Sequence, residues 1–137
     1  MYNDSSSPTL NLCAVAGNYA VQSGGGMYNS SASPTITTCM ITMNSAYAGG
    51  GVFNVNSSSP IVTGSVISNN SAAQYGSSVY NENASSPAFT NCTLYNYLDT
   101  DPGGEVCNDH SSPSFANCIV WSEGAIADSG IINGDGC

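Results

Sequence analysis

An internal repeat of 25 to 27 residues is the feature that most constrains the fold of this chain. Coils of that length appear when the 137-residue sequence is cut before each apolar–aromatic–Asn triplet, such as Met27-Tyr28-Asn29, and before the matching triplets at 106–108 and 131–133. A fixed period in this range is typical of solenoids, in which each repeat packs only against its neighbours. We therefore interpret residues 1–137 as a single solenoid domain. Its coils are 1–26, 27–51, 52–78, 79–105 and 106–130, followed by a partial coil at 131–137.

Aligned coils place the same type of residue in the same column. The first column is apolar in every coil and consists of Met1, Met27, Val52, Val79, Val106 and Ile131. Two positions later every coil carries an Asn, and this column consists of Asn3, Asn29, Asn54, Asn81, Asn108 and Asn133. Asn side chains that repeat at one position of stacked strands can bond amide to amide. The sequence therefore predicts an Asn ladder along the solenoid.

The apolar residues occur in short runs that Gly, Pro, Asn and Ser interrupt, a pattern that suits strands and not helices. We predict an all-β fold, a right-handed parallel β-helix of about five coils with three short strands in each. In coil 27–51 the residues expected to face inward are Ile36, Cys39, Ile41 and Ala46, and Thr35 and Thr37 are expected to face outward. The aromatic residues beside the first column are expected to stack on the outside, and these are Tyr2, Tyr28, Phe53 and Tyr80.

The chain has no Lys and no Arg, so its nine acidic residues give a formal net charge of −9. That charge excludes a nucleic-acid binder, because such proteins need a basic surface. It also excludes attraction to anionic membrane surfaces, and no apolar stretch of the sequence is long enough to span a bilayer. We expect neither nucleic acid nor membrane insertion.

Segment 24–46, GGGMYNSSASPTITTCMITMNSA, resembles the right-handed parallel β-helix repeats of secreted and surface-anchored bacterial proteins. Those include proteins of the polymorphic-outer-membrane-protein and pectate-lyase-like types. The resemblance extends over the whole chain and implies an extracellular or cell-surface location. It is specific for architecture and not for function, because this fold carries adhesins, autotransporter passengers, lyases and structural fibres.

Four of the six cysteines occupy one column, in which Ser65 takes the remaining position. Neighbouring coils lie about 4.8 Å apart, within the Cα separation that a disulfide accepts, whereas coils two apart do not. The feasible bridges are therefore Cys13–Cys39 and Cys92–Cys118, and Cys107 with Cys137 would fasten the last coil. A column of buried reduced thiols is the alternative.

The sequence contains no catalytic constellation that we can identify, and we predict that the protein is not an enzyme. Its single His, His110, lies in a turn where a solvated side chain is expected. The lyases that the chain resembles typically use a basic residue as the base, and this chain has no Lys or Arg. No cofactor is expected apart from Ca²⁺, for which weak candidate ligands are Asp99, Asp101, Glu105 and Asp109. A solvated acidic loop is the alternative.

Two further surface features come from the same columns. Sequons beside the Ser-rich turn predict glycosylation along one edge of the solenoid, at Asn3, Asn29, Asn56 and Asn83. Outward Thr residues raise the possibility of an ice-binding face. A complete Thr-x-Thr pair occurs only at Thr35 and Thr37, however, and the β-propensity of Thr is the favoured explanation.

The sequence starts and stops on a repeat without a polar cap, and two explanations stay open. The segment is cut from a longer β-helix, or copies associate head to tail into a filament. The residues expected at such contacts are Met1, Tyr2, Asn3, Ile131, Ile132 and Asn133. The expected function is that of a non-catalytic extracellular structural protein, a filament subunit or a surface or adhesive stalk. The alternatives are a carbohydrate-binding or carbohydrate-active β-helix fragment and an ice-binding solenoid, with glycans as possible partners.

Overall fold

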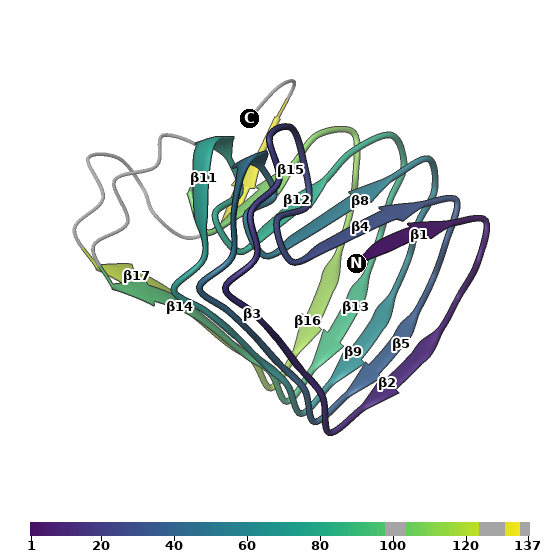
Figure 1. Cartoon of the computed structure of the whole chain (residues 1–137), viewed down its shortest axis with the longest axis horizontal. Coiled ribbons are helices and arrows are strands. Elements are labelled where there is room, and N and C mark those ends of the chain that lie inside the picture. The colour runs from purple at the N-terminus through teal and green to yellow at the C-terminus, as the bar shows by residue number, and fades with distance from the viewer. Residues whose placement is uncertain (98–103, 124–130, 135–137) are drawn as a thin grey trace.

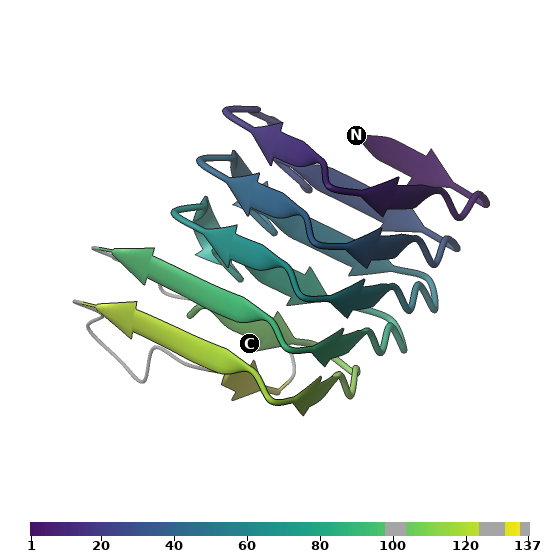
Figure 2. The ribbon, with the colours of Figure 1, turned by 90° about the horizontal axis from the view of Figure 1, so that it is seen from below.

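The computed structural model describes residues 1–97, 104–123 and 131–134, and these residues form strands and turns without a helix. All strand pairs are parallel and join successive coils, so the predicted β-solenoid is confirmed (Figure 1). In Figure 1 the chain runs clockwise as successive coils recede from the viewer, which makes the solenoid right-handed. Figure 2 shows the coils stacked one below the next.

Three long sheets run along the solenoid. Sheet A has six strands, β1 (Tyr2–Asp4), β4 (Met27–Ser30), β8 (Val52–Val55), β12 (Val79–Asn81), β15 (Val106–Asn108) and β18 (Ile131–Asn133). Sheet B has five, β2 (Thr9–Asn11), β5 (Thr35–Thr37), β9 (Ile61–Thr63), β13 (Ala88–Thr90) and β16 (Ser114–Ala116). Sheet C has five, β3 (Ala14–Ala16), β6 (Met40–Thr42), β10 (Val66–Ser68), β14 (Thr93–Tyr97) and β17 (Ile119–Glu123). A short sheet D pairs β7 (Ser45–Ala48) with β11 (Ser71–Tyr75).

The core is a narrow apolar column between sheets A, B and C. The strands pair in the register of the sequence columns, so that Met27 lies beside Val52 and Ile41 beside Ile67. The inward positions predicted for the second coil are confirmed, since Ile36 and Ile41 are fully buried and Cys39 and Ala46 are nearly so. Thr35 is exposed and Thr37 half-buried on the outer face of sheet B.

The Asn ladder is present and has a direction. In each step the Nδ2 of one Asn donates to the Oδ1 of the Asn in the following coil, at 2.8 Å. The steps run from Asn3 through Asn29, Asn54, Asn81 and Asn108 to Asn133. The buried amides are therefore satisfied by one another, as buried polar groups must be.

A second Asn row, which the sequence analysis missed, lies at the corner between sheets C and D. The backbone N–H and Nδ2 of Asn44 both donate to Asn70 Oδ1, at 3.0 Å. Asn18 bonds to Asn44 in the same way, and the N–H of Asn70 donates to Asn96 Oδ1. The spacing of 26 residues between these four Asn residues was a usable signal.

The Ser-Ser-Pro turn between sheets A and B carries two rows of side-chain bonds that run in opposite directions. In the first row a backbone N–H donates to a Ser Oγ of the following coil, from Ala32 to Ser58, from Ser58 to Ser85 and from Ser85 to Ser111. In the second row the N–H donates to the preceding coil, from Ser33 to Ser7, Ser59 to Ser33, Ser86 to Ser59 and Ser112 to Ser86. These bonds explain why every coil repeats Ser at this turn.

Candidate binding groove on the outer face of sheet A

The outer face of sheet A carries a row of aromatic side chains, one from each of four successive coils. The rings of Tyr2, Tyr28 and Phe53 stack with centroids 5.1 Å apart and interplanar angles of 10° and 14°. Tyr80 meets Phe53 edge to face, also at 5.1 Å, and lies 5.5 Å from Tyr75 of β11. The predicted aromatic row therefore exists, because parallel strands in register place like residues over one another.

The prediction that all four rings lie outside was wrong for two of them. Phe53 and Tyr80 are buried, and they form a second apolar cluster with Ala48, Val55 and Cys107. The cause is sheet D, which turns back over the outer face of sheet A and packs Ala48 and Tyr75 against the row. Near the first coil the cover is incomplete, so Tyr2 is 70% exposed and Tyr28 is half-buried.

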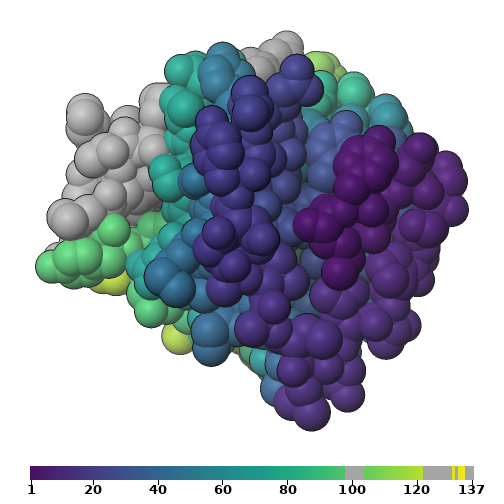
Figure 3. Space-filling model, viewed as in Figure 1, coloured from purple at the N-terminus to yellow at the C-terminus, as the bar shows by residue number. Residues whose placement is uncertain are grey.

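The incomplete cover leaves a groove of about 580 Å³. Its floor is formed by Tyr2, Tyr28 and Phe53, and segment 20–23 forms the opposite wall. That wall is held in place by backbone bonds, because Ser23 forms a parallel bridge with Ala48 and the Gly24 N–H donates to Ala48 O at 3.0 Å. Figure 3 views the molecule from the end of the solenoid, with the first coil in front. This wall was not predicted, although Ala20 shares a column with Ala46 and Ala72 at a spacing of 26 residues.

Carboxylates lie along the same face, in the row next to the aromatic rings. Asp4 ends β1, and Glu82 and Asp109 directly follow β12 and β15. Burial raises the pKa of Tyr28, with smaller contributions from Tyr2, Glu82 and Asp4. Burial, followed by the charges of Glu82 and Asp109, raises the pKa of Tyr80 to about 12. The phenols are thus neutral, and the negative charge of this face resides on its carboxylates.

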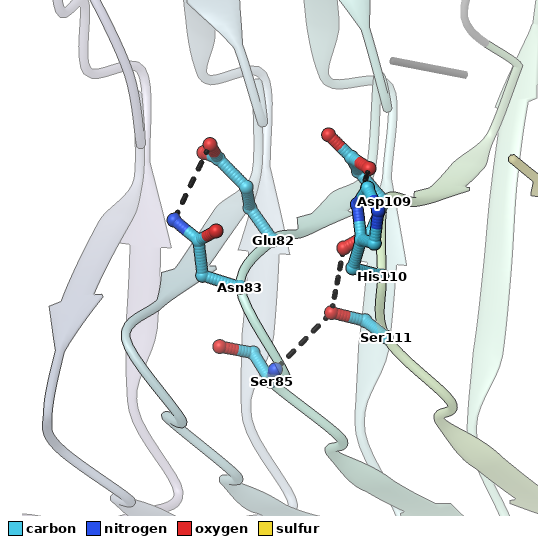
Figure 4. A network of polar contacts seen from close by, with 6 residues as sticks. All are labelled: Glu82, Asn83, Ser85, Asp109, His110 and Ser111. Atoms are coloured by element: carbon cyan, nitrogen blue, oxygen red, sulfur yellow. Dashed lines mark hydrogen bonds and ion pairs between the residues drawn. The ribbon is translucent and has the colours of Figure 1, made fainter. Parts of the chain in front are cut away.

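Figure 4 shows the polar contacts around Glu82 and Asp109. His110 Nδ1 lies 2.5 Å from Asp109 Oδ1, and the His110 side chain is 67% exposed. The Ser111 hydroxyl donates to the Asp109 carbonyl at 3.0 Å and accepts from the Ser85 N–H at 3.1 Å. Burial, and then the charge of Asp109, raises the pKa of Glu82. His110 is therefore an exposed turn residue beside an acidic pair.

The candidate calcium ligands are not gathered by the part of the chain that the structure describes. Asp99 and Asp101 lie outside the described residues. Glu105 is fully buried ahead of β15, where the hydroxyls of Ser77 and Ser78 donate to its carboxylate, and Asp109 lies beyond the other end of that strand. Within residues 1–97, 104–123 and 131–134, no group of three or more His, Cys, Asp or Glu is placed to hold a metal ion.

The expected bridges within the Cys column are not formed. Cys13, Cys39, Cys92 and Cys118 are free thiols. Each thiol points to the carbonyl two residues before it, as Cys39 does to Thr37 O at 3.2 Å, and not to the sulfur of the neighbouring coil. The sulfurs of Cys39 and Cys118 also accept an N–H from the preceding Cys of the column, and Ser65 Oγ does the same for Cys39. This shared role explains why Ser replaces Cys in one coil.

Cys107 and Cys137 lie outside the Cys column. Cys107 is fully buried in the second apolar cluster and is not among the free thiols. Its predicted partner, Cys137, lies outside the described residues.

Two of the predicted glycosylation positions were wrong. Asn3 and Asn29 belong to the interior Asn ladder, where their amides are bonded and closed to solvent. A glycosyl group there would break the ladder. Asn56 and Asn83 are exposed at the corner before the Ser-rich turn, and glycosylation at these two positions stays a prediction.

Of the residues expected at subunit contacts, those on the first strand are at an open edge. Met1 and Tyr2 are exposed, while Asn3 is buried in the ladder. At the other end, Ile131 and Asn133 are exposed on β18. Ile132 pairs with Cys107 along sheet A, and its side chain is outside the described part of the chain.

Comparison of this chain with protein-family models, with curated proteins and with solved structures finds no match. Among the described residues, no helix has the length and apolar character needed to cross a membrane.

Proposed function

We propose that the chain is a non-catalytic structural element of an extracellular fibre or stalk, related in type to the β-helix repeats of secreted and surface bacterial proteins. In this proposal copies stack head to tail, so that sheets A, B and C continue from one copy into the next. A contact of this kind is heterologous and gives an open filament.

The observation that carries the proposal is the direction of the Asn ladder. Its first residue, Asn3, uses its Nδ2 within the chain and keeps its Oδ1 as an acceptor. Its last residue, Asn133, uses its Oδ1, and its Nδ2 has no acceptor among the residues that the structure describes. The two ends are therefore chemically complementary, and a donor at one end meets an acceptor at the other when copies stack in the same orientation.

The sheet edges support the same arrangement. Strands β1, β2 and β3 lie at one edge of their sheets, while β18, β16 and β17 lie at the other. Exposed parallel edges pair readily with another strand unless charge, Pro or a bulge prevents it. The only charged residue in β1, β2 and β3 is Asp4.

Electron microscopy and sedimentation of the purified chain test the proposal. We expect rods that lengthen with concentration and have a subunit rise of about 25 Å, the height of five coils. Ile131→Lys places a charge at the exposed end of the apolar column and is expected to abolish the rods. Met43→Lys adds the same charge at an exposed corner of the second coil and should leave them intact. A monodisperse single-copy particle at all concentrations would refute the proposal.

A further inference from the structure

The groove on sheet A has properties that head-to-tail association of copies alone does not require. We propose that it binds an amino-bearing oligosaccharide, a short chain of cationic hexosamine units that lies across the first two coils. This ligand would lie on Tyr2 and Tyr28 against the wall formed by segment 20–23, with an amino group near Asp4 of the same face. The site is open on a single copy, because β1 with Tyr2 is the edge strand that head-to-tail association would cover.

The floor of the groove is repetitive in the direction of the axis. One ring from each coil contributes to it, and the ring centroids advance by 5.1 Å from Tyr2 to Tyr28 and again from Tyr28 to Phe53. A ligand therefore meets similar rings on the first two coils, Tyr2 and Tyr28, before sheet D covers Phe53 and Tyr80. An extended polysaccharide also repeats an apolar ring face at each sugar, and such faces pack on aromatic side chains.

The wall supplies both apolar contact and hydrogen-bonding groups. Ala20 and Val21 present methyl groups, and Gln22 and Ser23 present an amide and a hydroxyl, which suit the CH and OH groups of a sugar. The backbone of the wall is bonded to β7, so the groove is already formed without a ligand. A preformed site avoids the cost of ordering a loop when the ligand binds.

Charge determines which oligosaccharide fits. Asp4 lies on the same strand as Tyr2, and Glu82 and Asp109 follow farther along the same face, in the fourth and fifth coils. The whole chain contains no Lys or Arg to offset these charges. A uronate-containing chain is repelled by such a surface, whereas an ammonium group is attracted both by the carboxylates and by the aromatic rings. A polyamine or a Lys-rich peptide provides the charge without the apolar ring faces that the floor accommodates, so the hexosamine chain is the favoured occupant.

Calorimetry with saccharides of matched length tests the inference. The probes are a glucosamine oligomer, its fully N-acetylated counterpart, an oligogalacturonate and an oligolysine. The measurements are made at protein concentrations where sedimentation shows single copies, so a failure of the stacking proposal does not affect them. We expect binding of the glucosamine oligomer that weakens as salt is added, and weaker or no binding of the other three.

Variants locate the site. Tyr2→Ala removes the most exposed ring and Asp4→Asn removes a charge, and each is expected to lower the affinity by about fivefold or more. Tyr97→Ala removes a comparably exposed ring from sheet C, and its affinity should be unchanged. Equal binding of the N-acetylated oligomer or of oligolysine, an equal loss in Tyr97→Ala, or no binding of the glucosamine oligomer would each overturn the inference.

Discussion

Single Asn side chains show how this narrow core accommodates polar groups. Asn29, Asn54 and Asn81 have no exposed surface, yet each Nδ2 has an acceptor in the next coil and each Oδ1 has a donor in the previous one. A buried amide without partners is unfavourable, and a partner is guaranteed here only because every coil contributes the same residue. The stability of one coil at this position therefore depends on its two neighbours.

Replacing one ladder residue should affect three coils at once. Asn54→Ala leaves Asn29 Nδ2 and Asn81 Oδ1 buried without partners, and we expect the free energy of unfolding to fall by about 2–5 kcal/mol. Asn11→Ala removes the same groups from an exposed position of β2 and should change the free energy of unfolding by about 0.5 kcal/mol or less. Chemical denaturation followed by circular dichroism measures both. Equal effects would contradict the role assigned to the ladder.

Ionisation of the Tyr80 phenol should lower the stability of the folded protein at alkaline pH. Its pKa is raised to about 12, first by burial and then by the charges of Glu82 and Asp109, from a usual value of 10.0. The folded state thus favours the neutral phenol, and this contribution to stability is complete below pH 10 and is lost as the pH rises through about 12. Ultraviolet titration should show one phenol ionising near pH 12 that is missing in Tyr80→Phe. A titration curve that is identical in the variant would contradict the assignment.

At the scale of elements, Gly25 and Gly50, which form a Gly column at equivalent positions of the first two coils, allow sheet D to approach sheet A. A Cβ on Gly25 would lie 2.5 Å from the backbone oxygens of both Ser45 and Gly50. These atoms belong to the backbone and cannot move aside independently. The absence of a side chain at Gly25 is therefore a condition for the layer that forms the groove wall and covers Phe53.

A bulky residue in this column should detach the layer. Gly25→Val is expected to lower the free energy of unfolding by about 3 kcal/mol or more, because the methyl groups have no space. Gly17→Asn is the matched control, since Gly17 has a φ of 67° but nothing within 4 Å of an added Cβ, and Asn tolerates this backbone conformation. The control should lose about 1 kcal/mol or less. Similar losses in the two variants would show that packing of the layer does not depend on this glycine.

The free thiols of the Cys column should differ strongly in reactivity. Cys13 is exposed, whereas Cys92 is buried and burial raises the pKa of its thiol, which reduces the thiolate that reacts. In the native protein we expect iodoacetamide to modify Cys13 first and Cys92 only on unfolding, as followed by peptide mass spectrometry. Early modification of Cys92 would contradict the buried position.

The elements also show how far the sequence predicts this structure. The apolar and Asn columns predict sheets A, B and C with their register, because a fixed period places like residues over one another. Sheet D was not predicted, because coil length varies near this segment and its pairing between Ala72 and Tyr75 shifts register. The groove and the burial of Phe53 and Tyr80 both depend on sheet D, so neither follows from the columns. The thiol rotamers are likewise set by neighbouring carbonyls and not by column identity.

For the whole molecule, uniform negative charge opposes association of copies. Each copy carries −9, and its sequence isoelectric point is about 4.1. Repulsion between copies weakens when salt shortens the range of charge interactions to about 10 Å at 0.1 M and less above it. Edge pairing and contact between apolar columns are not weakened in this way.

Association should therefore increase with ionic strength. We expect the sedimentation coefficient at neutral pH to rise between low salt and about 0.5 M NaCl, because the Debye length falls well below the size of a subunit. The same rise should appear at low salt as the pH approaches the isoelectric point. Ile131→Lys should show neither rise. Dissociation by salt would indicate that ion pairs hold the copies together, contrary to the proposal.

The opposed Ser rows at the Ser-Ser-Pro turn also bear on how such a molecule changes during evolution. Because one row bonds to the following coil and the other to the preceding coil, an interior coil offers nearly the same donors and acceptors on both sides. Duplication or deletion of one whole repeat in the gene would leave the second row, in which every coil carries Ser, with its bonds intact at each junction. One extra residue is accommodated just ahead of the Ser pair, because Asn54 and Pro60 are six positions apart whereas Asn29 and Pro34 are five. Length in this protein can therefore vary in steps of one coil, while the Ser pair keeps its place within each coil.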